Sequence, residues 1–130
     1  MASIRKEIVV DNAPERVWDA LRDVGALHTR VCPGFVTNTV LEEGARIVTF
    51  GNGMVARELI VDVDDPARRV VWSVVGGRLT HHNASVQVLA DGKGSRVVWQ
   101  ADLPPHELAA DIRAMIEQAA RVMKPTLEKQ

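Results

Sequence analysis

Hydrophobic and polar residues alternate over most of the chain, which is the pattern of β-strands that bury one face. Turn residues such as Gly-Asn-Gly, Asp-Pro and Gly-Gly divide the pattern into segments. Seven strands are predicted, over residues 3–10, 35–41, 46–50, 55–63, 70–75, 80–89 and 96–103. The connections between the last six are short enough for antiparallel hairpins. The middle of the chain is therefore expected to form an antiparallel meander.

Two short helical segments are predicted between the first strand and the meander. Asn12 offers a capping side chain, Pro14 suits a first helical turn, and the carboxylate of Glu15 follows the cap by three residues. Apolar residues then follow at helical spacing, namely Val17, Trp18, Leu21 and Val24. We expect this helix to end near Gly25 and residues 27–31 to add another helical turn.

The hydrophobic period changes from that of a strand to that of a helix after Pro104-Pro105. One apolar stripe runs through Leu108, Ile112, Met115, Ile116, Ala119, Val122 and Met123. This predicts a helix of about five turns, which Pro125 should end or kink. The whole pattern predicts one α+β domain over residues 1–130, in which this helix lies across a curved seven-stranded antiparallel sheet and encloses an apolar pocket.

Composition excludes several classes of protein. Of the 130 residues, 46% are hydrophobic and 25% charged, as in an ordinary globular domain. The net charge of -1 comes without a basic stripe, so we expect no nucleic-acid partner. No run of about 18 apolar residues exists, and residues 1–7 are charged where a signal peptide would be apolar, so we expect no transmembrane segment and a cytoplasmic location.

Metal and disulfide chemistry have little support in the sequence. Cys32 is the only cysteine, so neither an intrachain disulfide nor a multi-cysteine zinc site can form. Adjacent strand residues point to opposite faces, so His81 and His82 cannot easily share one ion. We expect no metal and no cofactor. His28 and Cys32 could be interpreted as a thiol–imidazole pair, but structural or solvent-facing roles are the preferred interpretation.

The side chains of each strand can be assigned to two faces, of which the more apolar should face the helix. In 55–63 that set is Val55, Leu59, Val61 and Val63, which brings Arg57 inward and leaves Glu58, Ile60 and Asp62 outward. In 80–89 the set is Ala84, Val86 and Val88, which brings His82 inward. In the neighbouring strands the inward residues are Trp72 and Val74, and Val97, Trp99 and Ala101.

Arg57 and His82 are thus polar residues predicted on an apolar face, where an unpartnered charge or imidazole is costly. A ligand carboxylate, phenol or enolate would satisfy them, with Arg57 supplying fixed charge and His82 exchanging a proton near neutral pH. The alternative is that Arg57 pairs with an internal carboxylate or reaches an edge of the sheet, and that His82 bonds to a backbone carbonyl.

Three segments carry a resemblance to a known superfamily: residues 12–23 (NAPERVWDALRD), Arg57-Glu58-Leu59 with residues 62–69, and residues 95–99 (SRVVW) before the terminal helix. In this order they resemble the START-like, or Bet v 1-like, superfamily, and specifically its bacterial SRPBCC members of the polyketide cyclase/dehydrase type. The resemblance implies a helix-grip fold over nearly the whole chain. It leaves the activity open, because the superfamily includes carriers, cyclases, dehydrases and chaperone-associated modules. The family often has an aromatic residue where this chain has Cys32, before Pro33.

The leading hypothesis is a domain that binds a small apolar or aromatic molecule, polyketide-like or lipid-like, between the sheet and the terminal helix. The residues expected to bind it are Arg57, Leu59, Trp72, His82, Trp99, Met115, Ile116 and Val122. One alternative is a cyclase or dehydratase in which His82 shuttles a proton and Arg57 stabilises an enolate. Another is a protein-interaction module, and an outward Ile60, Val71 and Val98 would suit a homodimer.

Overall fold

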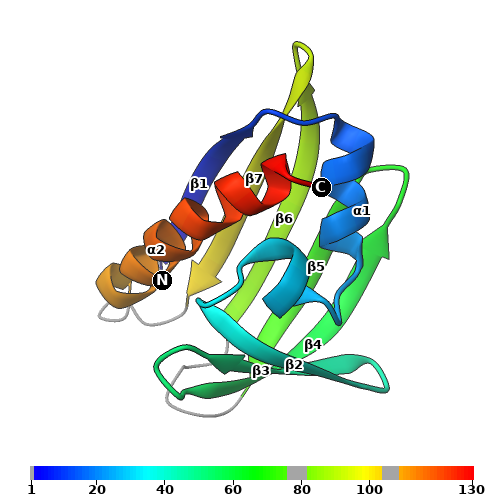
Figure 1. Cartoon of the computed structure of the whole chain (residues 1–130). Helices are drawn as coiled ribbons and strands as arrows, with labels where there is room; N and C mark the ends of the chain where they lie inside the picture. Colours follow the sequence, from blue (N-terminus) through cyan, green and yellow to red (C-terminus); the bar gives the residue numbers. More distant parts are fainter. Residues whose placement is uncertain (1, 76–81, 104–108) are drawn as a thin grey trace.

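The fold consists of one curved sheet and three helical segments, as the computed structural model shows for residues 2–75, 82–103 and 109–130 (Figure 1). The strands are β1 (Ala2–Val10), β2 (Val36–Glu42), β3 (Ala45–Phe50), β4 (Val55–Asp64), β5 (Arg69–Val75), β6 (His82–Asp91) and β7 (Gly94–Leu103). The helical segments are α1 (Pro14–Arg22), the π-helical turn η1 (Leu27–Val31) and α2 (Ala109–Glu128). The seven predicted strands and the predicted helices are confirmed. Residues 80 and 81 of the predicted sixth strand, and Leu108 of the predicted helical stripe, lie outside the described residues.

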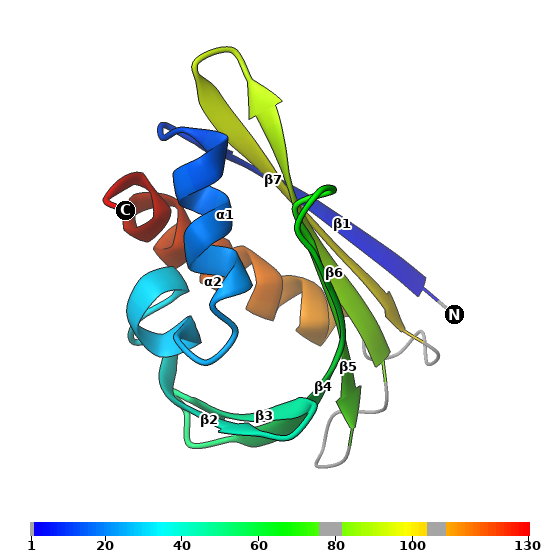
Figure 2. The ribbon, with the colours of Figure 1, turned by 90° about the vertical axis from the view of Figure 1, so that its right-hand side faces the viewer.

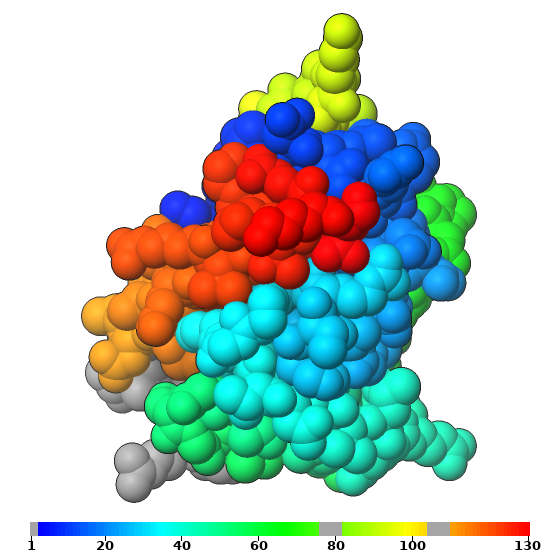
Figure 3. Space-filling model, in the orientation of Figure 1, coloured from blue at the N-terminus to red at the C-terminus, as the bar shows by residue number. Residues whose placement is uncertain are grey.

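All strand pairs are antiparallel, and the order across the sheet is β1-β7-β6-β5-β4-β3-β2. The sheet curves strongly at the β2–β3 end, and α1, η1 and α2 all lie within its concave side (Figure 2). On this side, the atoms of α2 adjoin those of α1 and η1, and β2 and β3 lie below them (Figure 3). The core is therefore the space between the helices and the concave face.

Pro125 does not end the terminal helix, which was one of the two outcomes expected of this proline, and the helix continues to Glu128. A proline removes one backbone donor, and three other features hold the turn that follows it. Leu127 is fully buried, and Thr126 Oγ1 donates a hydrogen bond to the carbonyl of Val122 (2.8 Å). Asn12 Nδ2 also donates to the carbonyl of Leu127 (3.0 Å). Asn12 thus holds the end of α2 and does not cap α1, whose N-cap residue is Ala13.

Strand β4 contains a bulge, which reverses the predicted facing of most of its residues. Ile60 pairs with Trp72 and Asp62 with Val71, so Val61 is an extra residue without a partner. An extra residue moves every side chain on one side of it to the opposite face. Val63 faces the core as predicted, but before the bulge Ala56, Glu58 and Ile60 face inward.

The bulge also removes part of the sequence argument for a homodimer. Ile60 was expected to point outward, and it packs against the core instead. Val98 of β7 lies between the inward Val97 and Trp99 and is not part of this core, but only 7% of it is exposed. Within the described residues, no helix is long and apolar enough to cross a membrane.

Candidate ligand-binding cavity

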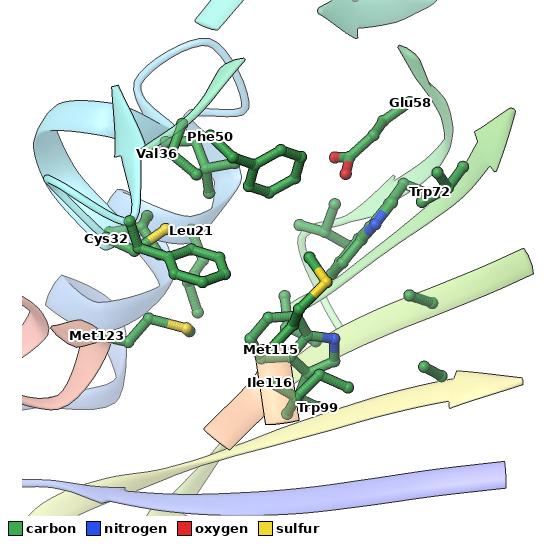
Figure 4. A pocket seen from close by; sticks show the side chains of 18 of the residues that line it. Leu21, Cys32, Val36, Phe50, Glu58, Trp72, Trp99, Met115, Ile116 and Met123 are labelled. Atoms are coloured by element: carbon green, nitrogen blue, oxygen red, sulfur yellow. The ribbon is translucent and has the colours of Figure 1, made fainter. Parts of the chain in front are cut away.

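A cavity of about 100 Å³ lies between α2 and the concave face of the sheet (Figure 4). Its walls come from η1, from the inward residues of β2 to β7, and from one face of α2, while Leu21 of α1 closes one side. Strand alternation and helical periodicity together produce this arrangement, because each element turns its apolar side chains to the same space. Most of the lining is therefore apolar or aromatic.

Five of the eight residues predicted to bind a ligand line this cavity: Trp72, His82, Trp99, Met115 and Ile116. Val122 is partly buried against the core but does not line the cavity. The inward placement of Arg57 and Leu59 is wrong, because the β4 bulge turns both to the outer face. The Leu59 residue is 38% exposed, and Arg57 pairs with Glu42 at the surface (3.5 Å). Their expected role in ligand binding therefore loses its structural basis.

A buried ion pair between Arg46 of β3 and Glu58 of β4 forms the polar end of the cavity. The two residues are direct cross-strand partners, and Arg46 Nε donates to Glu58 Oε1 over 2.8 Å. Their side chains are only 5% and 8% exposed. Arg46 Nη1 also donates to the carbonyl of Val24 (3.2 Å), and its guanidinium lies 5.3 Å from the ring centre of Trp72. These contacts satisfy a charge that burial alone would disfavour.

The inward position of Arg46 could have been predicted from the sequence. Val48 and Phe50 lie at alternate positions after Arg46, so an apolar inward face for this strand brings Arg46 with it. Strict alternation over 55–63 predicts Glu58 on the outer face, because Val55, Leu59 and Val61 make the opposite face the more apolar one. An arginine directly opposite a glutamate across two strands becomes visible only once the register is known.

Two aromatic pairs line the cavity. Trp72 and Trp99 lie with ring centres 6.3 Å apart, and Phe35 meets Phe50 edge to face at 5.7 Å. Met115 and Met123 of α2 turn their sulfur atoms toward the open space from opposite sides (Figure 4). Within the described residues, the buried indole Nε1 of Trp99 has no hydrogen-bond partner. The cavity therefore presents aromatic faces and flexible thioethers to an occupant.

His82 is buried, as predicted, and its side chain belongs to the same wall as the ion pair. Glu58 pairs with Val74, and Val74 pairs with His82, so these residues form one row across three strands. With Arg46 opposite Glu58, the row brings three polar residues to one end of the cavity.

In the described part of the chain, no cluster of His, Cys, Asp or Glu could hold a metal ion.

Cys32 and His28 do not share a site. Cys32 is buried in the cavity wall, and this burial raises the pKa of its thiol to about 12. His28 Nδ1 lies 3.1 Å from the hydroxyl of Thr39, and His28 does not line the cavity. A thiol with so high a pKa is protonated at neutral pH and is a poor nucleophile. The structure therefore gives both residues structural roles, as the sequence favoured.

Comparisons with solved structures place this architecture among known folds. XoxI from Bacillus cereus matches 99% of this chain and 94% of its own, with a TM-score of 0.83 and 18% identity. A protein from Thermobifida fusca is 26% identical over 98% of this chain and 91% of its own, with a TM-score of 0.75. Ara h 8.0201, a Bet v 1-type allergen, matches 99% of both chains, with a TM-score of 0.75 and 16% identity. These similarities show the helix-grip fold.

Sequence comparison gives the family. A search of curated proteins found no match. The family model described as "Polyketide cyclase / dehydrase and lipid transport" matches residues 1–129, which is nearly the whole chain. With its curved sheet, long terminal helix and apolar cavity, the chain belongs to this SRPBCC-type family of hydrophobic-ligand-binding domains with the Bet v 1-like fold.

Proposed function

We propose that the protein binds one small apolar or aromatic molecule, polyketide-like or lipid-like in character, in the cavity between the sheet and α2. The observation that carries the proposal is the cavity itself, lined by aromatic rings and two methionines with a buried ion pair at one end. Small-molecule sites usually combine such an apolar lining with a few placed polar groups. The family description, which names cyclases, dehydrases and lipid transport, supports the same proposal.

The volume of the cavity limits the size of the ligand. At about 100 Å³ it is smaller than the roughly 300–1,000 Å³ of typical ligand pockets. An apolar cavity of about 150 Å³ is known to hold benzene, so a ligand of one ring is close to the space available. A larger ligand requires side chains to move, and the unbranched Met115 and Met123 are the lining residues best able to do so.

The test is binding to the wild-type protein and to two matched variants. Ala84 lines the cavity on β6, whereas Ala90 of the same strand is exposed. Thermal-shift and native mass spectrometry screens with aromatic metabolites and lipids should identify ligands for the wild type. Ala84→Leu should weaken their binding at least about tenfold by filling the space, and Ala90→Leu should not. Equal binding by all three proteins would contradict the proposal.

A cyclase or dehydratase is the second candidate, favoured by the presence of His82 and Glu58 in one cavity. Arg57 no longer belongs in this mechanism, because it faces outward and pairs with Glu42. In the revised form, His82 moves a proton on the bound molecule, and Arg46 and Glu58 orient it. The measurement is turnover of an identified ligand by wild type and His82→Ala. Full activity in His82→Ala would exclude His82 from the reaction.

A further inference from the structure

The carboxylate of Glu58 has acceptor capacity that the protein does not fill. It extends from β4 toward the space between Phe50 and Trp72 (Figure 4). Arg46 Nε donates to its Oε1, and of the described residues Arg46 alone donates a hydrogen bond to it. An ionised carboxylate has two oxygens and roughly four lone-pair sites. A donor on a molecule in the cavity would therefore find an acceptor at this end.

The positive charge of Arg46 is already balanced by the carboxylate of Glu58. Arg46 uses Nε for Glu58 and Nη1 for the carbonyl of Val24, and its guanidinium packs against the face of Trp72. A ligand carboxylate placed here would have to compete with Glu58 for Arg46 while lying beside a like charge. Like charges in a site that excludes water oppose each other more strongly than they do in water.

Cys32 and His82 are the other titratable groups of the lining. Burial raises the pKa of the Cys32 thiol to about 12, so this group is neutral. His82 lies two strands from Glu58 in the same row, and its side chain is buried. Since the charges of Arg46 and Glu58 cancel, this end of the cavity suits a group without net charge.

We propose that the cavity selects neutral ring compounds that carry a hydroxyl group, such as phenols, over compounds of similar size that carry a carboxylate. The hydroxyl donates a hydrogen bond to Glu58, and the ring packs among Phe50, Trp72 and the methionines. This inference rests on the proposed function and adds the chemical class of the ligand to it. It also excludes free fatty acids and aromatic acids as preferred ligands.

Three probes of one ring each test the proposal on the wild-type protein: phenol, toluene and benzoate. Phenol and toluene have nearly the same shape and differ in the hydroxyl. Hydrogen bonds to charged groups are among the stronger ones, so phenol should bind about tenfold or more tightly than toluene. Benzoate should bind at least about tenfold more weakly than phenol. Affinities are measured by NMR titration, which detects weak binding.

The variant Glu58→Gln and its control Glu42→Gln extend the test. Glu42 is also paired with an arginine, but at the surface. In Glu58→Gln the charge of Arg46 is no longer neutralised, so benzoate should gain about tenfold in affinity and the preference for phenol over toluene should shrink. Glu42→Gln should behave as the wild type. If Glu58→Gln does not fold, the three affinities of the wild-type protein still decide whether the cavity prefers a hydroxyl group to a methyl group or a carboxylate.

The outcomes separate this inference from the proposed function. Equal binding of phenol and toluene, or benzoate binding as tightly as phenol, overturns the selection of a hydroxyl while leaving a binding cavity in place. Failure of all three probes to bind overturns this inference, and the ligand screens described above then decide whether the proposed function stands. Tight phenol binding that Glu58→Gln leaves unchanged, in a folded variant, overturns the role of Glu58.

Discussion

Replacing Arg46 by methionine should destabilise the protein far more than the same replacement of Arg57. Both arginines lie on neighbouring strands, and each faces a glutamate: Arg46 pairs with Glu58 at 2.8 Å and Arg57 with Glu42 at 3.5 Å. They differ in environment, since the side chains of the first pair are 5% and 8% exposed and those of the second 48% and 46%. The comparison therefore sets a buried ion pair, with its additional contacts, against an exposed one.

The expected magnitudes follow from this difference. Arg46→Met leaves the Glu58 carboxylate buried without its partner, which costs about 3–5 kcal/mol of unfolding free energy. The lost contact with Trp72 adds roughly 0.5–2 kcal/mol. Arg57→Met breaks an exposed pair and should cost between about 0 and 1 kcal/mol. The double variant Arg46→Met/Glu58→Leu should recover most of the loss, because it removes both charges together.

Urea unfolding, followed by tryptophan fluorescence and far-UV circular dichroism, measures these free energies. The slope of free energy against urea should be similar in all variants, so that differences in the midpoint report stability. Equal losses for Arg46→Met and Arg57→Met would refute the assignment of the two faces of β4. A double variant as unstable as Arg46→Met would refute the account of the buried pair.

Three further predictions concern other parts of the molecule. Ala84→Leu should raise the unfolding free energy by about 1–2 kcal/mol in urea unfolding, because the added methyl and methylene groups enter the cavity; a loss of that size would show that no space exists there. Arg22 and the Trp18 indole hold the pKa of Asp65 below its usual 3.8, so this carboxylate stabilises the fold above that pH and loses its effect in acid. Asp65→Asn should therefore lower the thermal midpoint at pH 7, and in calorimetry the difference from wild type should close as the pH falls below 3.8; a constant difference would contradict this prediction. With a thiol pKa of about 12, Cys32 should react with iodoacetamide much more slowly at pH 8 in the folded protein than in urea, as mass spectrometry can follow, and equal rates would place it outside the core.

The fold and much of the cavity follow from the sequence because most strands keep strict alternation. His82, Ala84 and Val86 on β6 face inward as predicted, and so do Trp72 on β5 and Trp99 on β7. The helical stripe placed Met115 and Ile116 correctly for the same reason. In these elements, burial of one apolar face is the only constraint that matters.

The polar end of the cavity could not be predicted from the sequence, because a local irregularity in β4 determines it. The bulge at Val61 breaks the alternation of β4, and nothing in the residue types of that segment marks where the extra residue lies. Strict alternation counted back from Val63 therefore predicts Arg57 on the inner face of β4, where the structure has Glu58. The Arg46–Glu58 pair is set by the register of two strands that are separate in sequence, which periodicity within one strand does not report.

The three tryptophan indoles provide the most direct test of the central claim, that a small molecule binds between α2 and the sheet. Trp72 and Trp99 line the cavity, whereas Trp18 lies outside it and donates to Asp65 (3.0 Å). In ¹H–¹⁵N spectra of labelled protein titrated with phenol, the indole signals of Trp72 and Trp99 should shift and reach saturation together. The Trp18 signal should stay in place. Shifts confined to Trp18, or no saturable shift at Trp72 and Trp99, would contradict the account.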